Sequence, residues 1–115
     1  MYRSIPIAAT ALMAGFAALA YAAATGPSQT VEIPGNALDN FDIGTIDAQA
    51  GRYYLADRSN SAVDVFDTRN GRFLAHVTGF TGVRNGPNGR PAGNISGPNG
   101  VAFDPVQKLV RINCP

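Results

Sequence analysis

Cysteine, histidine and tryptophan are nearly absent from this sequence. Its 115 residues include one cysteine, one histidine and no tryptophan. A single cysteine excludes an internal disulfide, so Cys114 either pairs with another chain or is an idle thiol. A single histidine, His76, excludes a Cys/His metal cluster. No Cys, Ser or carboxylate stands near His76 in the sequence, so it is not selected as a catalytic residue.

Charged residues are also scarce, at 15% of the chain. Nine Lys and Arg residues face eight Asp and Glu residues, for a formal net charge of +1. They form neither a basic patch nor an acidic tail. Nucleic acids and anionic membrane surfaces bind clustered Lys and Arg, so the sequence excludes both as expected partners.

The first 24 residues carry the features of an export signal. Arg3 is their only charged side chain, and Ala is the commonest residue after it. Ala22 and Ala24 fit the small-residue pattern at which a leader is cleaved. We therefore expect a signal-peptide helix over residues 1–24 and a periplasmic or secreted protein. The alternative is an uncleaved membrane anchor, since about 20 apolar residues span a bilayer. Only in that case would a membrane be a partner.

The rest of the chain, about 90 residues, is enough for one modest domain. Residues 25–40 are predicted to be a polar linker. In residues 41–78, short apolar runs alternate with turn residues, which is typical of antiparallel β-structure. The sequence therefore predicts an all-β fold built on a four-stranded antiparallel sheet. The expected strands are residues 41–46, 52–56, 62–66 and 73–77.

The turns between these runs contain residues suited to tight reversals. Gly51 and Gly71 can adopt the left-handed backbone conformation. Asp57, Asn60 and Asp67 have short polar side chains that hydrogen-bond turn amides. We expect all five residues to have a structural role.

The predicted strands are apolar on both faces. In the second strand Tyr53 and Leu55 oppose Tyr54 and Ala56, because successive side chains point to opposite faces. A sheet with one solvated face would alternate apolar and polar residues. The pattern therefore indicates a sheet covered on both sides, as in a stack of sheets.

The region after the fourth strand combines a long loop with the start of a repeat. Residues 79–100 are rich in Gly, Asn and Pro, and residues 101–115 open with a new apolar run. Asp42 stands five residues before the Asp that ends the first run, and Asn99 stands five before Asp104. This offset predicts an internal repeat of about 57 residues, including the long loop. Four-stranded repeats of this order are typical of β-propeller blades.

The segment "GRYYLADRSNSAVDVFDTRNGRFLA" resembles the NHL-type and YVTN-type blades of bacterial β-propellers. In these blades an apolar strand ending in Ala-Asp precedes an Asn-containing turn and a Val-x-Val-φ-Asp strand. "SGPNGVAFDP" resembles the opening of a following blade. The resemblance implies one complete propeller blade at residues 41–78 and the start of a second at 101–115. The matching positions are Tyr54, Leu55, Ala56, Asp57, Asn60, Val63, Val65, Phe66 and Asp67.

The final segment, "VQKLVRINCP", departs from the family pattern. No further Ala-Asp strand follows, whereas a closed propeller has about four to eight blades. We therefore expect a truncated propeller that cannot close a ring alone, or one that assembles with other chains. Uncovered sheet faces and an unpaired edge strand would then favour self-association.

Asp42 and Asn99 are the candidate metal ligands. Both stand at the entry of an expected innermost strand, and their carboxylate and amide oxygens suit a hard cation such as Ca²⁺. Asn99 also resembles a residue that helps to hold a divalent metal in gluconolactonase-like propellers, which are more distant relatives. The alternative is structural: Asn before Gly favours a turn, and Asp caps loops. No other cofactor is expected.

Two functions remain open at this point. The first is a non-catalytic scaffold that binds a ligand or protein, not identified by the sequence, through loops such as 79–100. The second is part of a divalent-metal lactonase or lyase of the gluconolactonase-like type. Fold alone does not decide between them. Because no catalytic set is visible, we expect the first.

Overall fold

A computed structural model describes residues 29–115. The expected signal-peptide helix, its cleavage residues Ala22 and Ala24, and the first part of the linker lie outside the described residues. All regular secondary structure in residues 29–115 is β. No helix in this range is long and apolar enough to cross a membrane.

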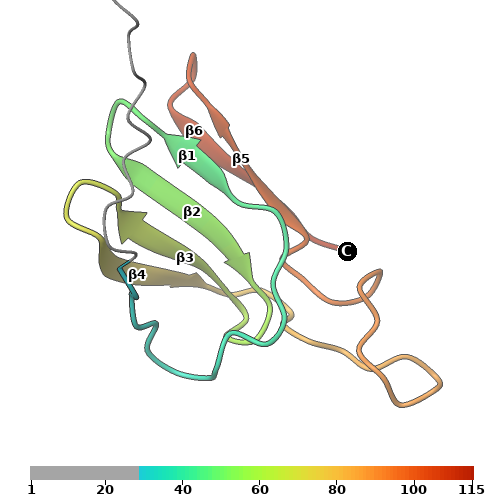
Figure 1. Ribbon diagram of the computed structural model, residues 1–115. Coiled ribbons are helices and arrows are strands. Elements are labelled where there is room, and N and C mark those ends of the chain that lie inside the picture. Colours follow the sequence, from blue (N-terminus) through green and yellow to red (C-terminus); the bar gives the residue numbers. More distant parts are fainter. Residues whose placement is uncertain (1–28) are drawn as a thin grey trace, which may run out of the picture.

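Six strands form one antiparallel sheet and one separate hairpin (Figure 1). The sheet has the strand order β1-β2-β3-β4, which confirms the predicted four-stranded antiparallel sheet. The hairpin pairs β5 with β6. The bounds are β1 Thr45–Asp47, β2 Arg52–Asp57, β3 Ala62–Asp67, β4 Arg72–Thr78, β5 Gly100–Asp104 and β6 Leu109–Asn113.

The four hairpin turns repeat one local design. Each turn follows an Asp that ends a strand, and the Asp carboxylate accepts backbone N–H groups two or three residues further on. These bonds satisfy amides that the strand ladder leaves free. The turn-forming residues are Asp47, Asp57, Asp67 and Asp104.

The fourth residue after each Asp has a positive φ. Gly51 and Gly71 have φ values of 66° and 58°, where glycine is favoured because it has no Cβ. Ser61 and Lys108 occupy the same place with φ values of 52° and 58°. The turn therefore imposes the left-handed conformation whatever residue stands there.

The first strand is shorter than the predicted range 41–46. Phe41 forms an isolated bridge with Asp57, whereas Ile43 forms a parallel bridge with Gly100 of β5. The chain thus changes partner within two residues, so no continuous ladder forms before Thr45. The expected strand 41–46 is wrong in its bounds for this reason.

One face of the sheet, the hairpin face, packs in part against the hairpin, which lies on the side of β1 and β2 (Figure 1). Ala56 and Val63 from the sheet and Val101 from β5 are buried together. Tyr54, Phe80, Val110 and Ile112 pack around them. This cluster is the core. The hairpin face contains Tyr54, Ala56, Val63, Val65 and Val77.

The opposite face, the strap face, lies beneath residues 31–38, which we call the strap. Val31 and Ile33 are half-buried while Glu32 between them is exposed, as expected for an extended segment with one apolar side. The predicted linker 25–40 thus contributes its second part to the fold. The strap face contains Ile46, Tyr53, Leu55, Asp64, Phe66 and His76.

A bulge in β4 changes which side chains share a face. Strict alternation of side chains along β4 would place Phe73 and His76 on opposite faces. The register between β3 and β4 shifts between Val65 and Phe66, which leaves one extra residue in β4. Phe73 and His76 therefore lie on the same face, with ring centroids 4.7 Å apart.

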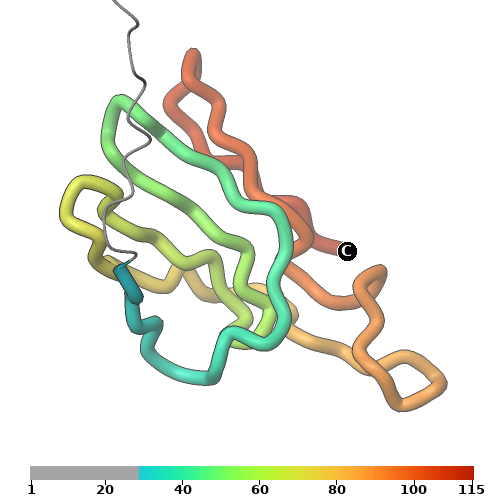
Figure 2. Tube along the Cα trace, viewed as in Figure 1, coloured from blue at the N-terminus to red at the C-terminus, as the bar shows by residue number. Residues whose placement is uncertain are grey.

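Residues 79–99 carry the chain from β4, at one edge of the sheet, back to β5 beside β1 (Figure 2). Hydrogen bonds between residues of the loop itself stabilise it. Gly82 and Gly97 exchange two backbone hydrogen bonds of 2.9 and 3.1 Å. The hydroxyl of Ser96, which is buried, donates to Ala92 O at 2.7 Å.

Candidate functional site

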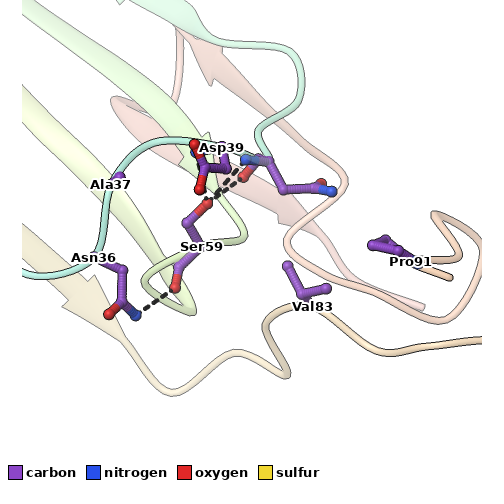
Figure 3. Close-up of a pocket in the computed structure, with 7 residues that line it drawn as sticks. Asn36, Ala37, Asp39, Ser59, Val83 and Pro91 are labelled. Carbon is purple, nitrogen blue, oxygen red and sulfur yellow. Dashed lines mark hydrogen bonds between the residues drawn. The ribbon is translucent and has the colours of Figure 1, made fainter. Parts of the chain in front are cut away.

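Three polar segments meet at the end of the sheet that holds the β2–β3 turn: residues 36–42, 57–61 and 79–99. They line a cleft of about 550 Å³, with Ser59 on one side and Val83 on the other (Figure 3). Ser59 Oγ accepts N–H groups from Asp39 at 3.1 Å and Asn40 at 2.9 Å. We call this region the loop end.

Arg58 is the centre of a polar cluster at the loop end. Its Nη2 donates a 2.8 Å hydrogen bond to Asn99 Oδ1 and forms an ion pair with Asp42. Its Nε donates to Pro98 O at 3.2 Å, and its Nη1 to Asn40 Oδ1 at 3.4 Å. Only 11% of the Arg58 side chain is exposed.

The structure therefore brings the two predicted metal ligands, Asp42 and Asn99, to one point, where Arg58 lies between them. The guanidinium supplies a positive charge and uses the oxygens that a cation would coordinate. In residues 29–115 no three His, Cys, Asp or Glu side chains are grouped so as to hold a metal ion. Asp42 and Asn99 therefore bind the guanidinium of Arg58 in place of a metal ion.

A second cluster lies on the strap face, where Asp64 and His76 face each other across β3 and β4. His76 Nδ1 is 2.7 Å from Asp64 Oδ1, and His76 Nε2 is 2.8 Å from Pro34 O in the strap. Asp64 is fully buried, and its Oδ2 has no hydrogen-bond partner in the described part of the chain.

The surroundings shift the proton affinity of both groups. Burial raises the pKa of Asp64 from 3.8 to about 6, although the hydrogen bond from His76 opposes this. Burial alone would lower the pKa of His76. The hydrogen bonds to Pro34 O and Asp64 outweigh it, so the pKa of His76 lies above its ordinary value.

Asp57 lies beside this pair, on the side of the loop end, where it ends β2. It is fully buried, and its Oδ2 accepts a 2.6 Å hydrogen bond from Asn60 Nδ2. Its Oδ1 accepts the backbone N–H of Asn60 at 3.1 Å. These are bonds of the kind expected of a turn-forming Asp and Asn pair.

The other predicted turn residues lie outside both clusters. Gly51, Asp67 and Gly71 are in the β1–β2 and β3–β4 turns, at the end of the sheet opposite the loop end. The side chain of Asn70 donates to Asp67, which lowers the pKa of Asp67 below its ordinary value. Cys114 is exposed.

Arg58 and Asp64 were missed by the sequence reasoning. Arg58 stands in an exposed-looking turn, and its partners are 16 and 41 residues away in the chain, so no local pattern marked it. Asp64 carried a signal that was not used: it is a charged residue between Val63 and Val65 in an otherwise apolar strand. Isolated charges in such strands are buried only with a partner.

In residues 29–115 the unpartnered Asp64 Oδ2 is fully buried, so a molecule in solution does not reach it. Both ring nitrogens of His76 are engaged, one by Asp64 and one by the strap. Arg58 donates four hydrogen bonds and cannot be deprotonated at ordinary pH. Both clusters therefore connect segments of the chain.

Comparison of the chain with models of protein families, with curated proteins and with solved structures found no match.

Proposed function

We propose that this chain is an exported, periplasmic or secreted β-propeller repeat module that acts as a non-catalytic binding scaffold. In this proposal β1–β4 form one blade, and β5–β6 begin the next. The observation that carries it is the parallel bridge between Ile43 and Gly100, which are 57 residues apart. That separation equals the repeat expected from the sequence, so equivalent positions of the two units lie side by side.

The side chains of the hairpin support the same relation. Val110 and Ile112 pack on the core beneath the hairpin. The residues that stand 57 positions earlier in the sequence are Tyr53 and Leu55, which are on the strap face. The equivalent face of each unit therefore packs on the segment that precedes it in the chain, which is the sheet for the second unit and the strap for the first. A propeller repeats this face-to-face contact around a ring.

The path of the chain between the strands also agrees with that of a β-propeller. β4 is the edge strand farthest from β1, and the loop 79–99 returns the chain to β5, which lies against β1 and β2. In a propeller the outermost strand of one blade is followed by the innermost strand of the next. A ring of about four to eight blades would need blades beyond those in residues 29–115.

The choice of a binding scaffold over a metal-dependent enzyme rests on Arg58. A divalent metal at Asp42 and Asn99 would have to displace a guanidinium held by several acceptors. We therefore propose that this cluster holds the two units together. The polar cleft of Figure 3, lined by three loop segments, is the surface offered to a ligand or protein.

Calcium titration separates the two functions. We expect no heat of binding when Ca²⁺ or Mn²⁺ is added to the chain in a calorimeter at millimolar concentration. Binding that Asp42→Asn and Asn99→Ala abolish, and that Asp104→Asn leaves unchanged, would favour the metal-dependent enzyme and overturn the scaffold proposal. Asp104 is the matched control because its carboxylate lies in a turn at the other end of the hairpin.

Photo-crosslinking in the exporting cell tests the binding surface. A benzoylphenylalanine at Val83, in the cleft, is expected to capture a partner protein. The same group at Val106, which is 88% exposed in the β5–β6 turn, is the control and should not. Equal capture from both positions, or capture from Val106 alone, would contradict the assignment of the loop end as the binding surface.

A further inference from the structure

The strap is attached to the strap face through a few polar contacts. His76 Nε2 contacts Pro34 O at 2.8 Å, near the middle of the strap. At its end, Asn36 N donates to Asn60 Oδ1 at 2.7 Å, and Asn36 Nδ2 donates to Ser59 O at 2.9 Å. Of these contacts, only the one made by His76 involves a titratable side chain.

Beneath the strap is an apolar groove of about 420 Å³. Val31 and Ile33 line it from the strap, and Tyr53, Leu55 and Phe66 line it from the sheet. Opening of the strap would expose this apolar surface to solvent. The groove is therefore closed by apolar contacts of modest area together with the polar contacts described above.

The His76 contact depends on protons. The imidazole faces two acceptors, the Asp64 carboxylate and the Pro34 carbonyl, and both need a hydrogen between the atoms. When His76 and Asp64 share one proton, both contacts have a hydrogen. One is on Nε2 and is donated to Pro34 O, and the other is the shared proton between Nδ1 and Asp64 Oδ1. After loss of that proton, one ring nitrogen must point a lone pair at an oxygen.

Either arrangement of the deprotonated pair is repulsive. If Nε2 keeps the hydrogen, the Nδ1 lone pair faces the buried Asp64 carboxylate. If Nδ1 keeps it, the Nε2 lone pair faces Pro34 O and the strap contact is lost. Because Asp64 is fully buried, the second arrangement is the less unfavourable one, since it keeps the one hydrogen-bond partner that this carboxylate has within residues 29–115.

We propose that residues 31–38 are a proton-controlled strap, which closes over the apolar groove while His76 and Asp64 share a proton and opens when that proton is lost.

The neighbouring carboxylates also favour the protonated state of the pair. Asp64 on β3 and Asp57 on β2 both raise the pKa of His76. Asp57 also raises the pKa of Asp64. The strap supplies Pro34 O and one charged side chain, Glu32, which is exposed and forms no ion pair in residues 29–115. Closure is therefore favoured on the acidic side, and opening follows as the pH rises.

Methyl NMR of the full chain measures the strap directly. The Ile33 methyl lies in the groove beside aromatic rings, so its chemical shift reports closure. We expect this shift to move toward its random-coil value as the pH rises above the ordinary histidine range, in step with the ring signal of His76. The control is Ile95, in the 79–99 loop, whose methyl shift should move several-fold less.

Asp64→Asn is the decisive variant. An amide at this position donates to a neutral His76 Nδ1, so Nε2 keeps its hydrogen for Pro34 O at every pH above the ordinary histidine range. The Ile33 shift should then stay at its closed value as the pH rises. His76→Gln removes the titrating group and should also abolish the transition.

Two results would overturn the proposal. One is an Ile33 methyl that does not move while His76 titrates. The other is a transition of the same size and midpoint in Asp64→Asn, with far-UV circular dichroism showing that the variant remains folded. If one variant does not fold, the other gives the same comparison.

Discussion

Arg58 Nη2 donates a 2.8 Å hydrogen bond to Asn99 Oδ1, so the β2–β3 turn of the sheet is tied to the start of the hairpin. The same guanidinium bonds Pro98 O and pairs with Asp42, so one side chain joins three segments of the loop end. Charge-assisted hydrogen bonds of this kind are stronger than neutral ones. Arg58 is therefore the main polar link between the two units.

Removal of this link should weaken the fold as a whole. Arg58→Ala is expected to lower the free energy of unfolding by about 2 kcal/mol, because hydrogen bonds to charged groups contribute about 1.5–3 kcal/mol. Arg58→Lys keeps the charge but not the planar fork, so it should recover less than half of the loss. Urea denaturation measures both. A loss below about 0.5 kcal/mol for Arg58→Ala, as at an ordinary surface site, would contradict this role.

The turn residue Lys108 offers a stabilising change. Its φ of 58° lies in the left-handed region, where Gly51 and Gly71 stand in equivalent turns. Lys108→Gly should raise the free energy of unfolding by about 1 kcal/mol, because non-glycine residues are strained there by roughly that amount. Thermal denaturation checks it.

Gly71→Ala is the matched reverse change. It introduces the same strain at φ 58°, and its new Cβ would contact the side chain of Gln29. It should lower the melting temperature while Lys108→Gly raises it. The two variants should change the melting temperature in opposite directions. A change in the same direction would show that the two turns are not equivalent.

The core beneath the hairpin should respond to loss of volume. Val63 is 1% exposed and packs with Val101 of β5. Val63→Ala and Val101→Ala should each lower the free energy of unfolding by about 1–2 kcal/mol, in line with small cavity-forming changes. Val106→Ala, at an exposed site, is the control and should have no measurable effect. If Val101→Ala is also neutral, the hairpin does not pack on the sheet in solution.

The buried carboxylate of Asp64 should make stability depend on pH. Its pKa is raised from 3.8 to about 6, so its contribution is full below the unfolded value and is lost as the pH rises through about 6. The raised pKa of His76 acts in the same direction. The free energy of unfolding should therefore fall between about pH 4 and about pH 7.

Asp64→Asn should remove most of this fall. At about pH 7 the variant should be more stable than the unmodified chain by on the order of 2 kcal/mol, since one pKa unit corresponds to about 1.4 kcal/mol. Asp67 is the contrast: its pKa is lowered, chiefly by Asn70, so its contribution is lost as the pH falls. A stability that rises with pH above about 6 would contradict the account of Asp64.

Much of the sheet could be predicted because its determinants are local. In β2, β3 and β4 an apolar run follows a turn with fixed chemistry, and Asp57 and Gly71 mark two of those turns. The first strand was misplaced because its partners are distant. Ile43 pairs with Gly100 across 57 residues, and no local pattern shows such a bridge.

The candidate clusters were harder to predict than the fold. Asp42 and Asn99 were identified, but the cation between them was not, because Arg58 reaches them only in the folded chain. The bulge in β4 had a similar effect: it moved His76 onto the face of Phe73 and brought it to Asp64. One extra residue in a strand is enough to change every later alternation.

A designed disulfide between positions 43 and 100 tests the central claim that equivalent positions of the two units lie side by side. A Cβ built at Gly100 lies 4.0 Å from Ile43 Cβ, within the range of about 3.5–4.5 Å that disulfides require. The variant carries Ile43→Cys and Gly100→Cys, with Cys114→Ser to leave no other thiol. The control carries Ile43→Cys and Val106→Cys in the same background.

After mild oxidation, mass spectrometry of the intact chain and its peptides gives the result. The account predicts an intramolecular disulfide between positions 43 and 100 in nearly all molecules, and none between positions 43 and 106. Free thiols, dimers linked between chains, or equal closure in the control would show that positions 43 and 100 are not neighbours and would contradict the proposed repeat.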